Sequence, residues 1–264
     1  MSDPRPIGVF DSGIGGLSVL TEIRKMLPAE DIIYYADSAN CPYGHKSPDE
    51  IISRSSIICD FLLSLGSKIL IVACNTASVA GLDTYRQKYQ TPIIGMEPAV
   101  KPATAVTQNG KIGVLATGVT LSGNRFSSLL QRYQNGSDVY SQPCPGLVEL
   151  VEAGRHNSPE TTRLLEKYIR PLLEKGVDTI VLGCTHYPFL KASVQAITGP
   201  RIAIIDTGEA VARQVKRVLE QHGLETPAGG TGTEIFHTSG AVEVVEPVIS
   251  KLWGGKPKVI HTPL

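Results

Sequence analysis

Two segments of the chain repeat each other, and the repeat limits the folds open to it. The segment IGVFDSG at 7–13 returns as IGVLATG at 112–118, an offset of 105 residues (112 − 7). Two cysteines repeat with a similar offset of 110 residues (184 − 74), because Cys74 ends the run ILIVAC and Cys184 ends TIVLGC. A chain of 264 residues can form two cores of ordinary domain size. The repeat therefore predicts two similar half-chains, each bringing one thiol to a common place.

Short apolar runs alternate with helical stretches in both halves, which indicates βαβ units on parallel sheets. The expected strands span 7–11, 32–37, 69–73, 92–96, 112–116, 138–142, 179–183 and 201–206, and the expected helices span about 16–26, 48–65, 78–89, 120–134 and 159–174. The runs 69–73 and 179–183 are apolar throughout, as expected for central strands covered by helices on both faces. The pattern predicts the α/β class for both halves.

A tail follows from about Thr207. It shows a helix over 209–223, a strand at 234–239, a helix over about 242–252 and a last strand at 258–262. The stretch AGGTGT at 228–233 is expected to be a solvated loop, since clustered glycine costs backbone entropy inside any regular element. Composition does not say which half the tail joins.

Charge and cysteine content exclude several classes of function. Lys and Arg together number 25, as do Asp and Glu, so no basic surface for nucleic acid or an anionic membrane is expected. A small-molecule ligand is favoured instead. No apolar run approaches the roughly 18 residues of a membrane span, and no leader pattern precedes the first strand. The five cysteines include no CxxC pair, which predicts free thiols in a cytoplasmic protein.

Both repeated cysteines stand where a strand ends. Ligands of open parallel sheets bind beyond the carboxyl ends of the strands, where helix N-termini favour anions and lower thiol pKa values from about 8.5. The alternative is that each cysteine only packs in the core, which is the commoner fate of an isolated cysteine. Two cysteines at equivalent positions favour a reactive pair. The residues that follow strands in this way are Asp11, Asp37, Cys74, Thr117, Cys184 and Asp206.

His186 follows Cys184 by two residues, and its imidazole can act as an acid or base or acidify the thiol. The histidine spacings fit no zinc site and HExxH is absent, so no metal is predicted. Cys59 lies in an apolar helix and is expected in the core. Cys41 and Cys144 precede prolines in loops and have no partner base nearby in the sequence.

The segment DSGIGG at 11–16 follows a strand and opens a helix. A dinucleotide-binding fingerprint would need glycine at position 18, which is Ser18, and no Walker A motif is present. We interpret the segment as a tight glycine turn that lets a ligand approach the backbone while Asp11 offers a carboxylate. Asn75, Thr76 and Ser78 can cap the helix after Cys74. Asn75 and Thr76 can equally hold a carboxylate or amino group, since the two roles are compatible.

Four motifs occur in order over nearly the whole chain: FDSGIGGLSVL, CPYG, ACNTAS and GCTHYP. Together they resemble the cofactor-independent glutamate racemases of the aspartate/glutamate racemase superfamily. The resemblance implies two flavodoxin-like parallel-sheet domains related by pseudo-twofold symmetry, with 1–97 plus 208–264 as the first domain and 98–207 as the second. It implies interconversion of L- and D-glutamate for peptidoglycan synthesis, by a homodimer and without pyridoxal phosphate or metal.

The same resemblance implies roles for individual residues. Cys74 and Cys184 are the expected catalytic acid and base, with Asp11 supporting the first and His186 the second. Glu152 is similar to a family glutamate on the histidine side, although position 149 is glutamate where many relatives have proline. The substrate contacts that it implies are Asp11, Ser12, Tyr43, Gly44, Asn75, Thr76, Thr117, Thr185 and His186.

The implied chemistry agrees with the paired cysteines. Racemisation removes the α-proton from one face and returns a proton to the other, so two thiols on opposite faces suffice. Three alternatives remain open at this point. They are a racemase of another amino acid such as aspartate, a one-thiol relative that decarboxylates or isomerises, and a two-lobed small-molecule binding protein whose cysteines only pack.

Overall fold

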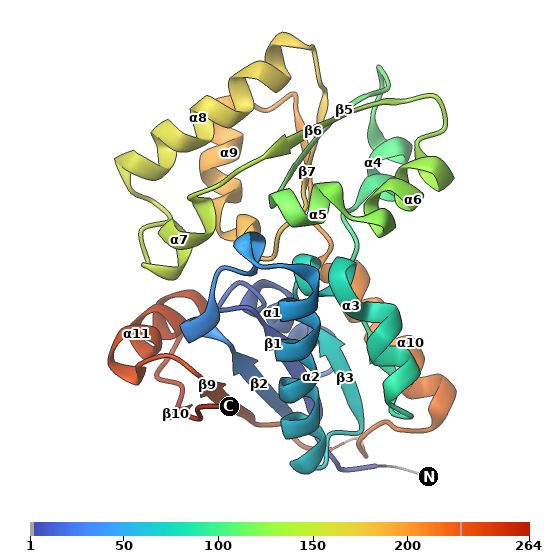
Figure 1. The fold of residues 1–264 in the computed structure, drawn as a ribbon, viewed down its shortest axis with the longest axis vertical. Coiled ribbons are helices and arrows are strands. Elements are labelled where there is room, and N and C mark those ends of the chain that lie inside the picture. Colours follow the sequence, from blue (N-terminus) through green and yellow to red (C-terminus); the bar gives the residue numbers. More distant parts are fainter. Residues whose placement is uncertain (1–2, 228) are drawn as a thin grey trace.

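The structure, a computed structural model, describes residues 3–227 and 229–264, and its strands form two sheets. Figure 1 shows the sheets in two lobes, one above the other. Every strand pairing in both sheets is parallel. The strands are β1 (Ile7–Asp11), β2 (Ile32–Ala36), β3 (Ile69–Val72), β4 (Ile93–Ile94), β5 (Lys111–Ala116), β6 (Asp138–Pro143), β7 (Thr179–Leu182), β8 (Ala203–Ile205), β9 (Glu234–Thr238) and β10 (Val259–His261).

Helices cover both faces of each sheet. The α-helices are α1 (Leu17–Met26), α2 (Pro48–Ser64), α3 (Asn75–Lys88), α4 (Val100–Val106), α5 (Gly118–Ser122), α6 (Asn124–Tyr133), α7 (Leu147–Glu152), α8 (Pro159–Glu174), α9 (Lys191–Thr198), α10 (Gly208–His222) and α11 (Val242–Trp253), and short 3-10 turns are η1 (Ser38–Asn40), η2 (Tyr43–His45) and η3 (Tyr187–Leu190). In the first lobe α1 and α10 pack on one face and α2 and α3 on the other; in the second, α4 and α6 oppose α8 and α9. None of the described helices is long and apolar enough to cross a bilayer.

The two sheets share one strand order. The first sheet runs β10-β9-β2-β1-β3-β4 and the second β6-β5-β7-β8, so each contains the order 2-1-3-4 of a flavodoxin-like sheet. The repeated segments form β1 and β5, and the two cysteines follow the equivalent strands β3 and β7. All residues of β3 and β7 are buried, as expected for central strands. The predicted fold class is confirmed, and the repeat in the sequence is a repeat in the fold.

The tail joins the first lobe. Strand β9 pairs with β2, and β10 pairs with β9, which extends the six-stranded sheet at that edge. Helix α10 packs along α1, and the elements drawn in red lie in the lower lobe of Figure 1. Residues 229–233 of the predicted loop form neither helix nor strand, whereas Ala228 lies outside the described residues.

Several predicted boundaries were wrong. Helix α3 begins at Asn75 and not near Ser78, because Cys74 itself serves as the N-cap. The single helix expected over 120–134 is two helices that meet at Gly123. A Cβ at Gly123 would lie 2.1 Å from Val79 Cγ1, so glycine lets this corner approach α3. The short helices α4, α7 and α9 were not predicted.

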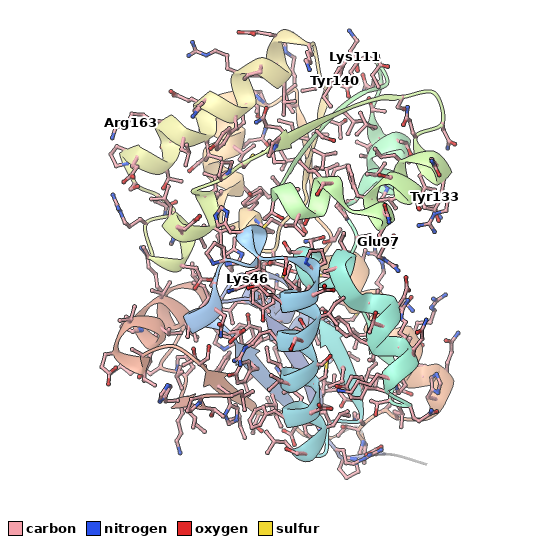
Figure 2. All side chains as sticks on the ribbon, in the orientation of Figure 1. Lys46, Glu97, Lys111, Tyr133, Tyr140 and Arg163 are labelled. Atoms are coloured by element: carbon pink, nitrogen blue, oxygen red, sulfur yellow. The ribbon has the colours of Figure 1, made fainter. Side chains whose placement is uncertain are left out.

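A group of charged side chains joins the lobes where the chain crosses between them. Figure 2 shows Glu97 at this junction, on the segment that connects β4 to α4. Arg125 of the second lobe binds Glu97 at 2.8 Å and also Asp83 of α3 at 2.8 Å. The return crossing is close by, since Glu97 and Thr207 line the same surface pocket. The two crossings therefore lie side by side, as in a hinge.

The opposite, amino-terminal edge of the first sheet holds a buried ion pair. Lys68 Nζ lies 2.6 Å from Glu30 Oε2, and both side chains are less than 5% exposed. Thr226 donates its N–H and its hydroxyl to the two oxygens of Glu30, and Lys68 Nζ donates to the carbonyl of Asp3. Every polar atom of the pair thus has a partner, and the pair fixes the tail to the sheet at Thr226, after α10.

We expect Lys68→Met to reduce the free energy of unfolding by about 3–5 kcal/mol, because the carboxylate of Glu30 would be left buried without its counter-charge. The matched control is Lys216→Met, which removes the same side chain from an exposed pair with Glu220 and should cost less than about 1 kcal/mol. Urea unfolding followed by circular dichroism measures both. Equal losses would show that burial of the Lys68 pair is unimportant.

Candidate active site

A small cavity lies between the lobes at the carboxyl ends of the strands. Its volume is about 10 Å³, close to the space that one water molecule needs. Both repeated cysteines reach it, one from each sheet. The cavity is lined by Ser12, Pro42, Tyr43, Gly44, Cys74, Asn75, Thr76, Thr117, Val148, Cys184, Thr185 and His186. Of the predicted site residues, only Asp11 and Glu152 stand behind this lining.

Cys74 enters the cavity as the N-cap of α3. Its sulfur accepts a hydrogen bond from Ala77 N at 3.4 Å and donates to Ser12 Oγ at 3.7 Å. Burial, together with the negative charge of Asp11, raises the pKa of the Cys74 thiol well above its ordinary value. Cys74 is therefore held as a thiol that needs a nearby proton acceptor before it can act as a base.

Asp11 is completely buried at the end of β1, beside Cys74 and Ser12. One carboxylate oxygen accepts from Gly16 N at 2.8 Å and from the hydroxyl of Thr185, in the other lobe, at 3.4 Å. Burial raises the pKa of Asp11, although the charge of His186 opposes the rise. A carboxyl group with a raised pKa suits the transfer of a proton to or from a thiol.

Cys184 belongs to a chain of hydrogen-bonding groups. Its sulfur lies 3.7 Å from His186 Nδ1, and His186 Nε2 donates to Glu152 Oε1 at 2.6 Å. Burial of His186 lowers its pKa, but the contacts with Cys184, Cys41 and Glu152 outweigh burial and raise the pKa well above the ordinary value. The imidazole can thus hold a proton beside Cys184 at neutral pH.

Glu152 also joins the lobes. The same oxygen, Oε1, accepts a hydrogen bond from Ile14 N of the first lobe at 2.7 Å. Glu152 lies in helix α7, which was not predicted from the sequence. Glu149 lies in the same helix, and Glu152 still makes its bond to Ile14. Glu149 instead lies 3.3 Å from His45 across the lobe boundary, where both side chains are exposed.

The glycine turn at 11–16 packs closely against two side chains of the second lobe, Glu152 and His186. A Cβ at Gly13 would lie 2.0 Å from Glu152 Oε1, and one at Gly15 would lie 2.2 Å from His186 Nδ1. The interpretation that these glycines also allow the approach of a ligand stays a prediction. They let the turn pack directly on the histidine and glutamate of the other lobe.

Hydroxyl and amide groups line the wall of the cavity between α3 and α5. Thr117 Oγ1 lies 3.0 Å from both Thr76 Oγ1 and Thr120 Oγ1, which links the lobes on this side. Asn75 is 2% exposed, and its amide has no hydrogen-bond partner among the described residues. A buried amide without a partner is costly, so Asn75 is available to a polar ligand.

Tyr43 and Gly44 form the roof of the cavity in η2. The Tyr43 hydroxyl donates to Asp37 at 2.6 Å, and Asp37 also binds Arg54 at 2.8 Å. Asp37, one of the predicted strand-end residues, is thus occupied in holding Tyr43 in place. At Gly44 a Cβ would lie 3.1 Å from Thr117 Cβ, so glycine allows the roof to approach the second lobe closely.

Some residues near the cavity were missed. Pro42 and Val148 line it, and Thr120 completes the threonine group. Cys41, for which no partner was expected, has donor atoms of Glu152 and His186 nearby, the three lying within 4.8 Å of one another. The CPYG motif was the signal in the sequence that could have singled out Cys41. Its contact with Glu152 and His186 could not be predicted, because both residues lie more than a hundred positions away in the sequence.

Comparisons with known proteins agree on one family. Residues 7–215 match the Asp/Glu/Hydantoin racemase family. The chain is 50% identical to the glutamate racemase of Pseudomonas paraeruginosa over 98% of this chain and 97% of that protein. The structure is similar to a Bacillus anthracis glutamate racemase (TM-score 0.90, 34% identity, 98% of both chains). It is also similar to the Escherichia coli glutamate racemase in complex with L-glutamate and the activator UDP-MurNAc-ala (TM-score 0.84, 33% identity, 98% of both chains).

We expect Gly15→Ala to lower the free energy of unfolding by about 1–3 kcal/mol, because the added methyl must displace His186 from its contact with the turn. Gly118→Ala is the matched control, since nothing lies within 4 Å of its Cβ position. Thermal unfolding of both variants gives the comparison. A Gly15→Ala protein as stable as Gly118→Ala would contradict the close packing of the turn on His186.

Proposed function

The chain belongs to the Asp/Glu/hydantoin racemase family, and we propose that it interconverts L- and D-glutamate by moving protons between the α-carbon and the thiols of Cys74 and Cys184. One observation carries the mechanism. Two cysteines, each following a strand of a different sheet, face one small cavity. This arrangement puts an acid and a base on opposite sides of a bound carbon atom.

The reaction needs one thiolate and one thiol. The thiolate takes the α-proton, and the electron pair of the broken C–H bond moves onto the α-carbon and the adjoining carboxylate. The opposite thiol then gives its proton to the other face of the α-carbon and becomes a thiolate. Atoms and charge balance, and the two cysteines exchange roles when the substrate has the other hand.

Each cysteine has its own proton partner. Asp11 serves Cys74, since both are buried together and Asp11 has a raised pKa. His186 serves Cys184, and the carboxylate of Glu152 stabilises the imidazolium that forms when His186 takes the thiol proton. Asp11 and Glu152 act behind the lining of the cavity. They orient the groups that meet the substrate and set their protonation.

The site itself must stabilise the carbanion, because the mechanism uses neither pyridoxal phosphate nor a metal. Free N–H groups and the positive dipole end at the start of α3 lie beside Cys74 and suit the substrate carboxylate. The Asn75 amide and the Thr76 and Thr117 hydroxyls offer further partners, with Ser12, Tyr43, Gly44 and Thr185 closing the wall. Exclusion of water strengthens all these interactions.

Substrate entry requires the lobes to separate. A cavity of about 10 Å³ has room for a single water molecule and not for glutamate. We place the domain boundaries at the paired crossings, so that 1–97 plus 208–264 move as one body and 98–207 as the other. The exposed contact between His45 and Glu149 and the threonine group break on opening and form again on closure.

The cellular setting follows from the reaction. The D-glutamate product supplies peptidoglycan synthesis. We propose that the protein acts in the cytoplasm, because all five cysteines are free and thiol chemistry requires a reducing compartment. We further propose that it works as a homodimer, on the resemblance of its motifs to the family.

Incubation of the protein with L-glutamate in D₂O, with no added cofactor, should yield D-glutamate that carries deuterium at the α-carbon. Cys74→Ser and Cys184→Ser should each reduce this racemisation by at least about 10²-fold, because a serine hydroxyl is a far weaker acid than a thiol and is not ionised at neutral pH, so it can neither give nor take the proton readily. Chiral chromatography and mass spectrometry measure both quantities.

Cys59→Ala is the matched control, because Cys59 is buried in α2 away from the cavity. Its activity per folded molecule should be unchanged. Full activity of either serine variant would exclude the two-thiol mechanism. Activity with aspartate but not with glutamate would exclude the proposed substrate.

His186→Asn should lower kcat/KM about 10²- to 10⁴-fold and by the same factor in both directions, because the two enantiomers have equal free energies. Proton transfer by Cys184 then becomes the slow step. The primary isotope effect of α-deuterated glutamate should therefore rise for only one enantiomer, the one whose α-proton Cys184 removes.

Asp11→Asn should produce the same asymmetry for the other enantiomer. If both variants affected the same enantiomer, the pairing of Asp11 with Cys74 and His186 with Cys184 would be wrong.

A further inference from the structure

Three donor groups of different chemistry meet on the outer side of His186. A sulfur of Cys41, a carboxylate oxygen of Glu152 and a ring nitrogen of His186 all lie within 4.8 Å of one another. Cys41 does not line the cavity that holds the two catalytic thiols, and the proposed reaction gives it no part. The cluster thus adds Cys41, which contacts His186, to two residues with roles in the proposed reaction.

The donor set suits one class of ligand. Sulfur, imidazole nitrogen and carboxylate oxygen together are typical of zinc and related divalent transition metals, whereas magnesium and calcium prefer oxygen alone. A tetrahedral zinc ion with bonds of about 2.0–2.3 Å holds neighbouring donor atoms roughly 3.3–3.8 Å apart. The Cys41 thiolate and the Glu152 carboxylate also carry two negative charges, which balance a divalent cation.

We propose that Cys41, Glu152 and His186 form an inhibitory binding site for Zn²⁺ behind the catalytic thiols. His186 contributes Nε2, since Nδ1 faces Cys184 and Nε2 faces Glu152. The bond between Nε2 and Glu152 Oε1, 2.6 Å long, opens by about an ångström to admit the ion. Ile14 N continues to hold Glu152 from the other lobe, as an outer hydrogen bond that orients a ligand.

The ion has a route to this position. A surface pocket of about 510 Å³ is lined by Cys41 and Glu152, together with Ile14 of the glycine turn and Glu149. His186 is 1% exposed and does not line this pocket, so the ion reaches the thiol and the carboxylate first and the imidazole last. Two carboxylates in the wall attract a cation, and the open side of the pocket leaves a fourth position for water.

The consequence for catalysis rests on the proposed function. A metal on Nε2 keeps the remaining ring proton of His186 on Nδ1, facing Cys184. The imidazole can then no longer take the proton of the Cys184 thiol, and the carboxylate of Glu152 no longer stabilises an imidazolium. Both directions of racemisation lose the same acid–base partner, so the metal inhibits without entering the substrate cavity.

Metal binding is tested first without reference to activity. The catalytic thiols also attract metals, so the protein used is the Cys74→Ser/Cys184→Ser double variant, freed of metal with a chelator and titrated with Co²⁺. Sulfur bound to Co²⁺ gives a charge-transfer absorption in the near ultraviolet. We expect this absorption at one Co²⁺ per chain and its loss when Cys41→Ser is added, while Zn²⁺ displaces the Co²⁺.

Inhibition is tested in the otherwise unchanged protein. Zn²⁺ should inhibit racemisation and a chelator should restore it. Each variant is compared with its own activity in the absence of metal, because Cys41 contacts His186. Cys41→Ser should require at least tenfold more Zn²⁺ than the parent for the same fractional inhibition. Cys41→Ala is the second variant, and thermal unfolding establishes that each one is folded.

Two results would overturn the proposal. One is a Co²⁺ absorption that is absent from the double variant or that survives Cys41→Ser. The other is a Cys41→Ser protein as sensitive to Zn²⁺ as its parent, which would assign inhibition to the catalytic thiols. A protein that binds Co²⁺ through Cys41 but racemises no glutamate would instead contradict only the proposed function.

Discussion

Glu152 Oε1 accepts two hydrogen bonds at once, from His186 Nε2 in its own lobe and from Ile14 N in the other. This shared oxygen joins the lobes at the point where proton transfer is proposed. It also explains the glycines of the turn, because any side chain at Gly13 or Gly15 would collide with Glu152 or His186. The contact between His186 and Glu152 lies within the second lobe, and the hydrogen bond from Ile14 N ties that pair to the glycine turn of the first.

The molecule divides its polar groups between the two ends of its sheets. At the amino-terminal edge, Lys68 and Glu30 are buried with every partner supplied by the protein, which fixes the tail and gives no opening to a ligand. At the carboxyl edge, the Asn75 amide is buried without a partner among the described residues. A buried polar group whose hydrogen bonds are all supplied by the protein indicates a structural role, whereas one with an unfilled hydrogen bond indicates a ligand site.

Cys41 shows that a cysteine beside His186 need not line the substrate cavity. It lies next to His186, yet it faces a surface pocket and not the substrate cavity. The imidazole of His186 thus has Cys184 on its cavity side and Cys41 on the side of the surface pocket. His186 itself is 1% exposed, so a ligand in the surface pocket meets Cys41 and Glu152 before it meets Nε2.

The sequence by itself determined the repeated architecture, because strand runs and their punctuation are local: β1 and β5 share residues, and β3 and β7 each end at a cysteine. It also indicated the thiols and His186, since strand ends in parallel sheets collect at one edge. The short helices α4, α7 and α9 were not predicted from the sequence, because helices of six to eight residues show little periodicity and depend on packing for their stability. The cap of α3 by Cys74 is a local contact with Ala77 N, which sequence reasoning assigned to the polar residues after Cys74. Only the tertiary structure decided that Glu152 reaches Ile14 and that Cys41 meets His186, because these contacts depend on how the two lobes pack and not on any local pattern.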